Sequence, residues 1–341
     1  MSRRPRPRRS SARPRRAPRR TLWRLIAAIL IAGSALLAAA LFLIFGPGPA
    51  GPRGAPVLLK PGSGVVAIGE ALERGRAVRS AWLFVATAEA TGASHRLQAG
   101  EYLIPRRASV WRAVQMIEDG RVVRRFVTIP EGFTSAAAAE TLEAARELSG
   151  PVAPPMEGSL LPETYEVRRG ETRQSVLERM EGAQAALLAR LWARRQPGLP
   201  YRSSRDAVVL ASIVEKETAL PQERPHVAAV FLNRLRQGIR LGSDPTVIYG
   251  LTGGRPLGHG LTRAELQSDT PFNTYRREGL PPAPIDNPGR ASLIAALDPM
   301  HTDDLYFVAD GTGGHAFSAN IADHDRNVAR WRQIEKAGQG R

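Results

Sequence analysis

The feature that most constrains this chain is an uncharged apolar stretch near its N-terminus, Leu25–Gly46. Twenty-two helical residues at about 1.5 Å each are long enough to cross the hydrocarbon core of a membrane, which is about 30 Å thick. Pro47, Gly48 and Pro49 follow and should end the helix. The apolar region of a cleaved signal peptide is normally only about 7–15 residues long, so we favour a retained anchor. The stretch therefore predicts a protein that crosses the membrane once.

The residues before this stretch form a strongly basic tail. Eleven arginines and no acidic residue lie among residues 1–24, and subtracting them from the formal net charge of +16 leaves +5 for the rest of the chain. Met1–Arg20 has almost no apolar side chain and should be disordered. The positive-inside rule places this tail in the cytoplasm and everything after Gly46 across the membrane. Attraction to anionic lipids accounts for its charge more simply than nucleic acid, so we expect no nucleic-acid partner.

The composition after the span predicts two folded units of an α+β protein. Residues 47–56 read as a linker and residues 57–125 as a small α/β module, whose role as a spacer, glycan-binding domain or purely structural domain the pattern leaves open. Residues 126–341 read as a larger mixed α/β domain. The chain has no cysteine, which excludes thiol chemistry and disulfides, and its six histidines show no metal-ligand spacing. We therefore expect neither a metal site nor a cofactor.

Hydrophobic periodicity gives the positions of most elements. Strands are expected at Val57–Leu59, continuing at Val65–Val66 after a turn, and in Leu97–Pro105 and Val122–Ile129. The segments Leu241–Gly250 and Leu305–Ser318 read as short strands and rigid loops. Helices are expected at Ala67–Arg74, Ser80–Thr91, Val110–Asp119, Ser135–Leu148 (with Thr134 as cap), Gln174–Arg195, Ser204–Thr218 (with Ser204 as possible cap) and His226–Gly238.

The helix Ser204–Thr218 carries two glutamates near its end, Glu215 and Glu217. Residues two apart on a helix point in directions about 200° apart, so the two carboxylates should not face the same cleft. Glu217 continues the heavier apolar stripe of the helix. Partial desolvation there would raise its pKa and favour the protonated form, as a general acid requires. We expect Glu215 to be structural; from this stretch alone, an ordinary ion pair is an alternative for either glutamate.

Several polar loops of the second unit combine Asn, Asp, Thr, Tyr and Pro, which suits a carbohydrate groove of hydroxyl partners and flat apolar faces. These loops, with the helix just described, resemble the endolytic murein transglycosylases, the YceG-like family. The segments that carry the resemblance are EGSLLPETY (157–165), LASIVEKETA (210–219), VFLNRLRQGIRLGSDPTVIYG (230–250), TPFNTYRREGLPPAPIDNPG (270–289) and LYFVADGTGGHAFS (305–318).

The resemblance implies a cytoplasmic N-terminus, one span of the inner (plasma) membrane, a LysM-like module over residues 57–125 and an extracytoplasmic catalytic domain over residues 126–341. It implies a lyase-type enzyme that cleaves the MurNAc–GlcNAc bond within nascent peptidoglycan strands, leaves 1,6-anhydro-MurNAc ends and limits glycan chain length. It assigns the catalytic acid to Glu217 and implies penicillin-binding protein synthases as partners.

A lytic transglycosylase needs only one acid/base group, which suits a chain in which Glu217 stands out. We expect five residues to orient the sugar or hold Glu217, although structural hydrogen bonds are an alternative for each: Glu163, Asp244, Asn273, Tyr275 and His315. Two other functions compete with this one. A hydrolytic muramidase would use Glu217 with Glu163 or Asp244, and a membrane-tethered peptidoglycan-binding scaffold would have no activity.

Overall fold

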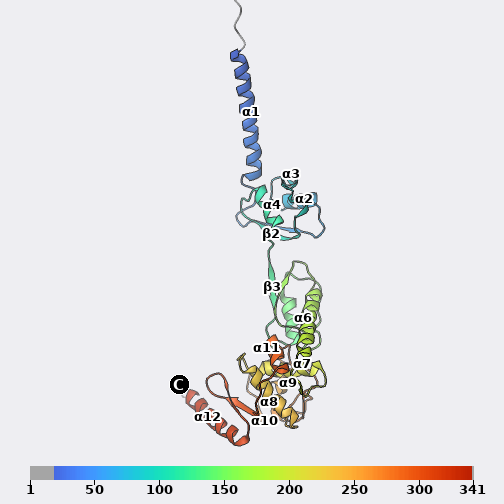
Figure 1. Ribbon diagram of the computed structural model, residues 1–341, viewed down its shortest axis with the longest axis vertical. Coiled ribbons are helices and arrows are strands. Elements are labelled where there is room, and N and C mark those ends of the chain that lie inside the picture. The colour runs from blue at the N-terminus through green and yellow to red at the C-terminus, as the bar shows by residue number, and fades with distance from the viewer. Residues whose placement is uncertain (1–18, 340–341) are drawn as a thin grey trace, which may run out of the picture. The chain divides into compact units, whose positions relative to one another are not determined.

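The structure of the protein is a computed structural model that describes residues 19–339 (Figure 1). Residues 1–18, which hold most of the tail predicted to be disordered, lie outside the described residues. The chain divides into two compact units, unit 1 up to Val123 and unit 2 from Arg124. Both units combine helices with short antiparallel strands, so the predicted mixture of helix and sheet is confirmed.

The predicted membrane span is part of a long helix, α1 (Arg19–Phe45). The most apolar 18-residue window of its segment Leu22–Phe45 has a mean hydropathy of 2.6 and is not buried against the rest of the protein. The helix ends just before Pro47, which has no N–H to continue the hydrogen-bonding pattern. Its length and composition fit a single-pass membrane anchor.

The remainder of unit 1 packs helices on a two-stranded sheet. Strand β1 (Ala55–Leu59) pairs antiparallel with β2 (Gly100–Ile104), with Ala55 opposite Ile104. The other elements are α2 (Val65–Arg74), α3 (Ala81–Ala90), the short 3-10 helix η1 (Ala93–His95) and α4 (Val110–Glu118). Their apolar faces enclose one core, which includes Leu72, Phe84, Tyr102 and Ile117.

The expectation that Val65–Val66 continues a strand was wrong. A tight turn, in which the Ser63 N–H donates to the Lys60 carbonyl, separates this pair from β1. Gly64 then takes the N-cap position and Val65 begins α2. Within this first turn, Val65 packs against the core while Val66 is exposed.

Unit 2 contains two hydrophobic cores. The first lies between the antiparallel strands β3 (Arg125–Thr128) and β4 (Thr164–Val167) and the helices α5 (Ser135–Ala144) and α6 (Arg173–Ala193). As predicted, Thr134 caps α5, because its side chain accepts a hydrogen bond from the Ala137 N–H.

The second core of unit 2 surrounds helix α7 (Ser204–Glu217), which packs against α8 (Arg224–Arg236) and α11 (Arg290–Leu297) (Figure 1). Residues 207–214 of α7 are all buried, so this helix is enclosed on every side over two turns. The cap is Ser203 rather than Ser204, and the Asp206 carboxylate accepts from the Ser203 N–H and hydroxyl.

The remaining elements of unit 2 are α9 (Asp244–Thr252), α10 (Arg263–Leu266), the hairpin β5 (Tyr306–Ala309) with β6 (His315–Ser318), and α12 (Ile321–Gln339). The hairpin confirms the strands expected in Leu305–Ser318. The segment Leu241–Gly250, in contrast, was expected to be strand and loop but holds most of α9. Pro245 in the first turn supplies a preset helical φ, which prevails over the β-branched residues that follow.

Candidate active site

Glu217 is the last residue of α7, where the buried helix reaches the surface of unit 2. The next residue, Thr218, has an extended backbone, so the chain turns away at this point. The side chain of Glu217 is half-buried. The apolar helix thus places a single carboxyl group at the edge of the core.

The closest partner of Glu217 is Ser243. Its hydroxyl donates to Glu217 Oε1 at 2.5 Å, a short hydrogen bond. Ser243 occupies the N-cap position of α9, yet its hydroxyl makes no capping bond to the helix backbone. The Ser243 N–H donates to the hydroxyl of Thr274, which also bonds to the hydroxyl of Thr246. Ser243 is therefore held from both sides while it contacts the carboxyl group.

The surroundings of Glu217 raise its pKa to about 7. Burial is the main cause, because it disfavours the charged form, and the negative charge of Asp244 acts in the same direction. The hydrogen bond from Ser243 and the positive charges of His315 and Arg234 oppose this shift. A carboxyl group with this pKa exchanges a proton readily near neutral pH.

Asp244 and Tyr275 form a pair next to Glu217. The Tyr275 hydroxyl donates to Asp244 Oδ1 at 2.7 Å, and 40% of Tyr275 remains exposed. Burial and the neighbouring Asp244 carboxylate raise the pKa of this phenol, so it stays protonated at neutral pH. The pair presents a carboxylate and an aromatic face, which are groups that bind sugar hydroxyls and sugar rings.

Asn273 is completely buried. Its amide donates to the carbonyls of Leu266 and Ser268, and its side-chain oxygen accepts from the Tyr275 N–H at 3.0 Å. The structure thus places Asn273 where it shapes the loop that carries Tyr275, rather than at an exposed sugar-binding position.

His315, on β6, is held by Glu223. The His315 backbone N–H donates to Glu223 Oε1 at 2.9 Å, and His315 Nδ1 lies 2.7 Å from Glu223 Oε2. The Thr218 hydroxyl donates to the same carboxylate at 3.1 Å. Burial alone would raise the pKa of Glu223, but these hydrogen bonds outweigh it and lower the pKa. The ionised carboxylate links the end of α7, one residue after Glu217, to the β5–β6 hairpin.

Arg234, on α8, is the second cation whose charge acts on Glu217. Its Nε and Nη1 groups donate to the carbonyls of Leu305 and Leu241, each at 2.6 Å. Its guanidinium group also lies over the ring of Tyr306, 5.3 Å from the centroid. These contacts fix a positive charge close to the candidate acid.

Glu163, the fifth predicted orienting residue, has other partners. It is exposed and forms an ion pair with Arg290 at 2.9 Å. None of its contacts among the described residues involves Glu217 or Ser243.

Glu215 belongs to a structural network. Its side chain is only 5% exposed; Oε1 accepts from Arg224 at 2.9 Å, and Oε2 accepts from the Gly289 N–H and the Ser292 hydroxyl. It has no hydrogen-bond partner in common with Glu217 among the described residues. The network ties α7 to α8 and to the start of α11.

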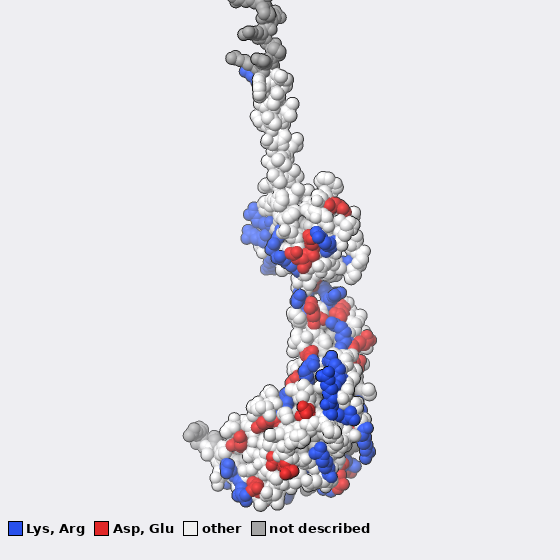
Figure 2. Space-filling model, in the orientation of Figure 1, with Lys and Arg blue, Asp and Glu red and all other residues white. Residues whose placement is uncertain are grey.

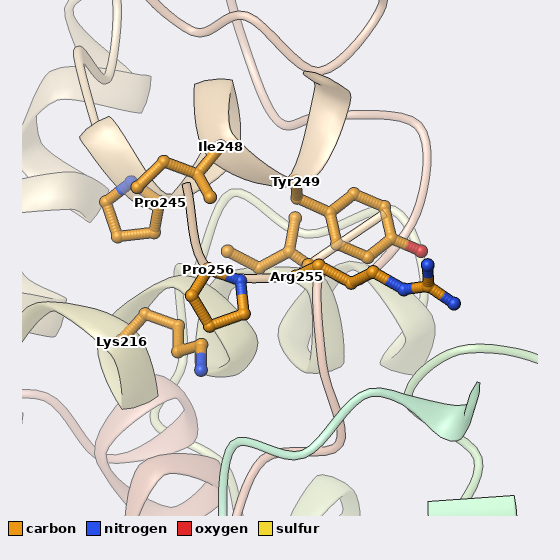
Figure 3. A pocket seen from close by; sticks show the side chains of 8 residues that line it. Lys216, Pro245, Ile248, Tyr249, Arg255 and Pro256 are labelled. Carbon is orange, nitrogen blue, oxygen red and sulfur yellow. The ribbon is translucent and has the colours of Figure 1, made fainter. Parts of the chain in front are cut away.

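A pocket of about 290 Å³ lies beside the end of α7 (Figure 3). Figure 3 shows Lys216 facing Pro256 across it, with the long side chain of Arg255 extending beside Tyr249. The lining is mainly apolar, and its two cations are Lys216 and Arg255. The lining residues are Lys216, Pro245, Ile248, Tyr249, Gly254, Arg255, Pro256 and Ile285. Pro245 follows Asp244 and Lys216 precedes Glu217 in the chain, so the pocket borders the cluster described above, which consists of Glu217, Glu223, Arg234, Ser243, Asp244, Tyr275 and His315.

Three residues of the cluster were missed from the sequence: Ser243, Glu223 and Arg234. Ser243 had a signal, since a hydroxyl residue before Asp-Pro marks a helix start and so a place where side chains converge. The sequence carries no such signal for Glu223 or Arg234. A Glu before a helix and an Arg within a helix are usually surface residues, and only the fold brings these two close to Glu217.

The sequence of this chain is similar to those of known proteins. Residues 57–330 match the sequence model of the YceG-like family. The endolytic murein transglycosylase of Streptococcus pneumoniae strain D39 is 34% identical over 188 residues, which is 51% of this chain and 32% of that protein. The endolytic murein transglycosylase of Bacillus subtilis is 32% identical over 173 residues, 50% of this chain and 47% of that protein.

This chain thus spans less than half of the length of these two relatives. A crystal structure of a putative YceG-like protein from Listeria monocytogenes superposes with a TM-score of 0.53 at 26% identity. That match covers 81% of this chain and 99% of the Listeria chain.

Proposed function

This chain belongs to the YceG-like family, and on that premise we propose that it is a membrane-anchored endolytic lytic transglycosylase. Its substrate would be nascent peptidoglycan, in which it cleaves the bond between MurNAc and GlcNAc inside the glycan strand. The observation that carries the proposal is Glu217, a carboxyl group with a pKa of about 7 held by Ser243 at 2.5 Å. The names of the two relatives support the same activity.

In the proposed mechanism Glu217 acts twice. Its protonated carboxyl group donates the proton to the glycosidic oxygen, and the bond from that oxygen to C1 of MurNAc breaks. The resulting carboxylate then accepts the proton of the C6 hydroxyl while the C6 oxygen bonds to C1. The products are a 1,6-anhydro-MurNAc end and a free GlcNAc hydroxyl, and Glu217 is protonated again. No water, second carboxylate nucleophile, metal or cofactor takes part.

The surrounding residues have separate roles in this proposal. Ser243 orients the Glu217 carboxyl group, while Asp244, Tyr275 and His315 contact the sugar. Asn273 acts through Tyr275 as a positioning residue. We leave Glu163 out of the site because its ion pair with Arg290 lies outside the cluster.

The cellular setting follows from the anchor. We propose that the N-terminus is cytoplasmic, that α1 crosses the inner membrane, and that the part of unit 1 after α1 and all of unit 2 lie on the extracytoplasmic side. In this setting residues 57–125 would be a LysM-like module next to the membrane, and penicillin-binding protein synthases would be partners, as suppliers of new glycan strands.

The test is digestion of uncrosslinked glycan strands by the detergent-solubilised full chain, followed by mass spectrometry of the ends. We expect 1,6-anhydro-MurNAc ends within the strands; reducing MurNAc ends would identify the alternative muramidase instead. Glu217→Gln should abolish cleavage while leaving the melting temperature unchanged within a few degrees. The control is Glu140→Gln, an exposed carboxylate on α5, which should cleave like the unmodified chain. If Glu217→Gln still cleaves, the assignment of the acid is wrong, and if the unmodified chain does not cleave, the scaffold alternative is favoured.

A further inference from the structure

The end of α1 is held against unit 1 by ring packing and backbone hydrogen bonds. The rings of Phe45 and Trp111, near the start of α4, have centroids 5.5 Å apart. The Gly48 N–H donates to the carbonyl of Arg107 at 3.1 Å. A Cβ added to Gly48 would lie 2.1 Å from the Ala108 carbonyl oxygen, so the two backbones could not approach as closely with any other residue. The folded part of unit 1 therefore begins directly at the end of the candidate span.

The side chains around this end are basic and aromatic. Arg79 donates from Nη2 to the Pro47 carbonyl at 2.8 Å, and Trp82 at the start of α3 is 74% exposed. Arg79, Arg107 and Arg112 are exposed, and none of them forms an ion pair among the described residues. We call the following five residues the collar: Arg79, Trp82, Arg107, Trp111 and Arg112.

Figure 2 shows basic side chains gathered on unit 1 close to where α1 ends, on the left of the view. One carboxylate is near the collar, since Glu73 accepts from the Ala81 N–H at 3.2 Å. It offsets one of the three positive charges, so the collar stays cationic.

The length of the span sets the depth of the collar. Leu22–Phe45 is 24 residues long, or about 36 Å, which exceeds the hydrocarbon core of about 30 Å. The end of α1 therefore lies among the lipid headgroups, and the collar lies beside that end. Tryptophan is the side chain that favours this depth, and arginine pairs with lipid phosphates there.

We propose that the collar is a membrane-contact surface, in which the two tryptophans lie at headgroup depth and the three arginines bind the phosphates of anionic phospholipids. The part of unit 1 after α1 would then rest on the outer face of the membrane instead of moving freely on a tether. This inference rests on the anchoring proposed for α1 and is independent of the cleavage chemistry.

The absence of cysteine from the chain allows a direct test of depth. The full-length variant Trp82→Cys carries a single environment-sensitive fluorophore and is reconstituted into vesicles of phosphatidylcholine with 30% phosphatidylglycerol, a composition of our choosing. Headgroup-spin-labelled lipid is the quencher. The matched control is Leu58→Cys, a 48% exposed apolar position on β1 of the same unit. Flotation with the vesicles measures anchoring separately.

We expect strong quenching at position 82 and at least threefold weaker quenching at position 58. Equal quenching at the two positions, or none at position 82 in chains that float with the vesicles, would overturn the proposal. Chains that do not float would overturn it together with the proposed anchor, whereas loss of cleavage alone would leave it standing.

The arginines are tested by a matched pair of double variants carrying the label at position 82. Arg107→Gln with Arg112→Gln should lower the quenching in the anionic vesicles to the level seen in pure phosphatidylcholine. Arg96→Gln with Arg121→Gln removes two exposed arginines that pair with Glu118 and Asp119 at the far end of α4, and it should have no effect. Equal effects of the two double variants would contradict specific phosphate binding by the collar.

Discussion

At the scale of single residues, Glu217 depends on its place at the end of a buried helix. Burial raises its pKa to about 7, while the bond from Ser243 and the charge of Asp244 shift that pKa in opposite directions. The two neighbours are adjacent in the chain, one just before and one at the start of α9. Removing the Ser243 hydroxyl and removing the Asp244 charge should therefore shift the pKa of Glu217 in opposite directions.

Ser243→Ala should move the alkaline limb of the pH–rate profile to higher pH. The serine hydroxyl donates to the carboxylate and so stabilises the ionised form; without it the pKa of Glu217 rises. The maximal rate should fall by roughly tenfold, because the carboxyl group loses its fixed orientation. Initial rates of strand cleavage between pH 5 and 9 provide the measurement, and Ser243→Thr, which keeps the hydroxyl, should restore the original limb.

Asp244→Asn should move the same limb to lower pH. Removing the negative charge beside Glu217 makes ionisation easier and lowers its pKa. The asparagine oxygen can still accept from Tyr275, so the loop should keep its position. The same rate series is the measurement, and an upward shift would show that Asp244 does not act on Glu217 through its charge.

Sequence reasoning identified some of these residues and not others, for a physical reason. Glu217, Asp244, Tyr275 and His315 could be chosen because their type and local pattern suit sugar chemistry. Asn273 is polar as well, but the loop closes over it, and its amide group forms its hydrogen bonds within that loop. Whether a polar side chain points into a site or into its own loop depends on contacts made after folding, which periodicity does not encode.

At the scale of elements, the helices with a long apolar stripe were predicted well and those with local start signals less well. The expected ranges for α6 and α7 lie within two residues of the observed ones, because a repeat of 3.6 residues persists over several turns. Helix α9 was missed because its β-branched run resembles a strand and only the Ser-Asp-Pro start indicates otherwise. α7 is the element on which the site depends, and Glu215 is what joins it to its neighbours.

Glu215→Gln should destabilise the protein rather than alter its chemistry. The substitution removes the negative charge that pairs with the buried Arg224, which keeps only the longer 3.3 Å contact with Glu131. Breaking a buried ion pair on one side costs about 3 kcal/mol, which is roughly 6–12 °C in melting temperature for a unit of this size. Thermal unfolding followed by circular dichroism is the measurement. At a temperature where the variant is folded, its rate of cleavage should stay within about tenfold of the unmodified chain; a larger loss would mean that Glu215 takes part in the reaction.

At the scale of the whole molecule, two units with separate cores share one chain. The core of unit 1 gathers residues from Ala50 to Ile117, and the cores of unit 2 begin at Val127. No core cluster among the described residues draws on both units. Stability and cleavage should therefore respond independently to changes in the two units.

Calorimetry should show this independence as two unfolding transitions. Phe84→Ala, in the core of unit 1, should lower the free energy of unfolding of that unit by about 3–5 kcal/mol. The transition of unit 2 should stay in place. Phe231→Ala, in the second core of unit 2, should lower only the other transition. Cleavage of soluble glycan should survive the first substitution at temperatures that unfold unit 1. A single transition that moves with both substitutions would contradict the division.

The pKa of Glu217 has a physiological consequence if unit 2 lies outside the cytoplasm. Its proton would then come from the extracytoplasmic side of the membrane. With a pKa of about 7, roughly nine tenths of the molecules would carry the proton at pH 6 and roughly one tenth at pH 8. Strand cleavage would slow in alkaline surroundings with no change in protein level. If the proposed cleavage also limits strand length in the cell, glycan strands should be longer in cells grown in alkaline medium than in cells grown in acidic medium.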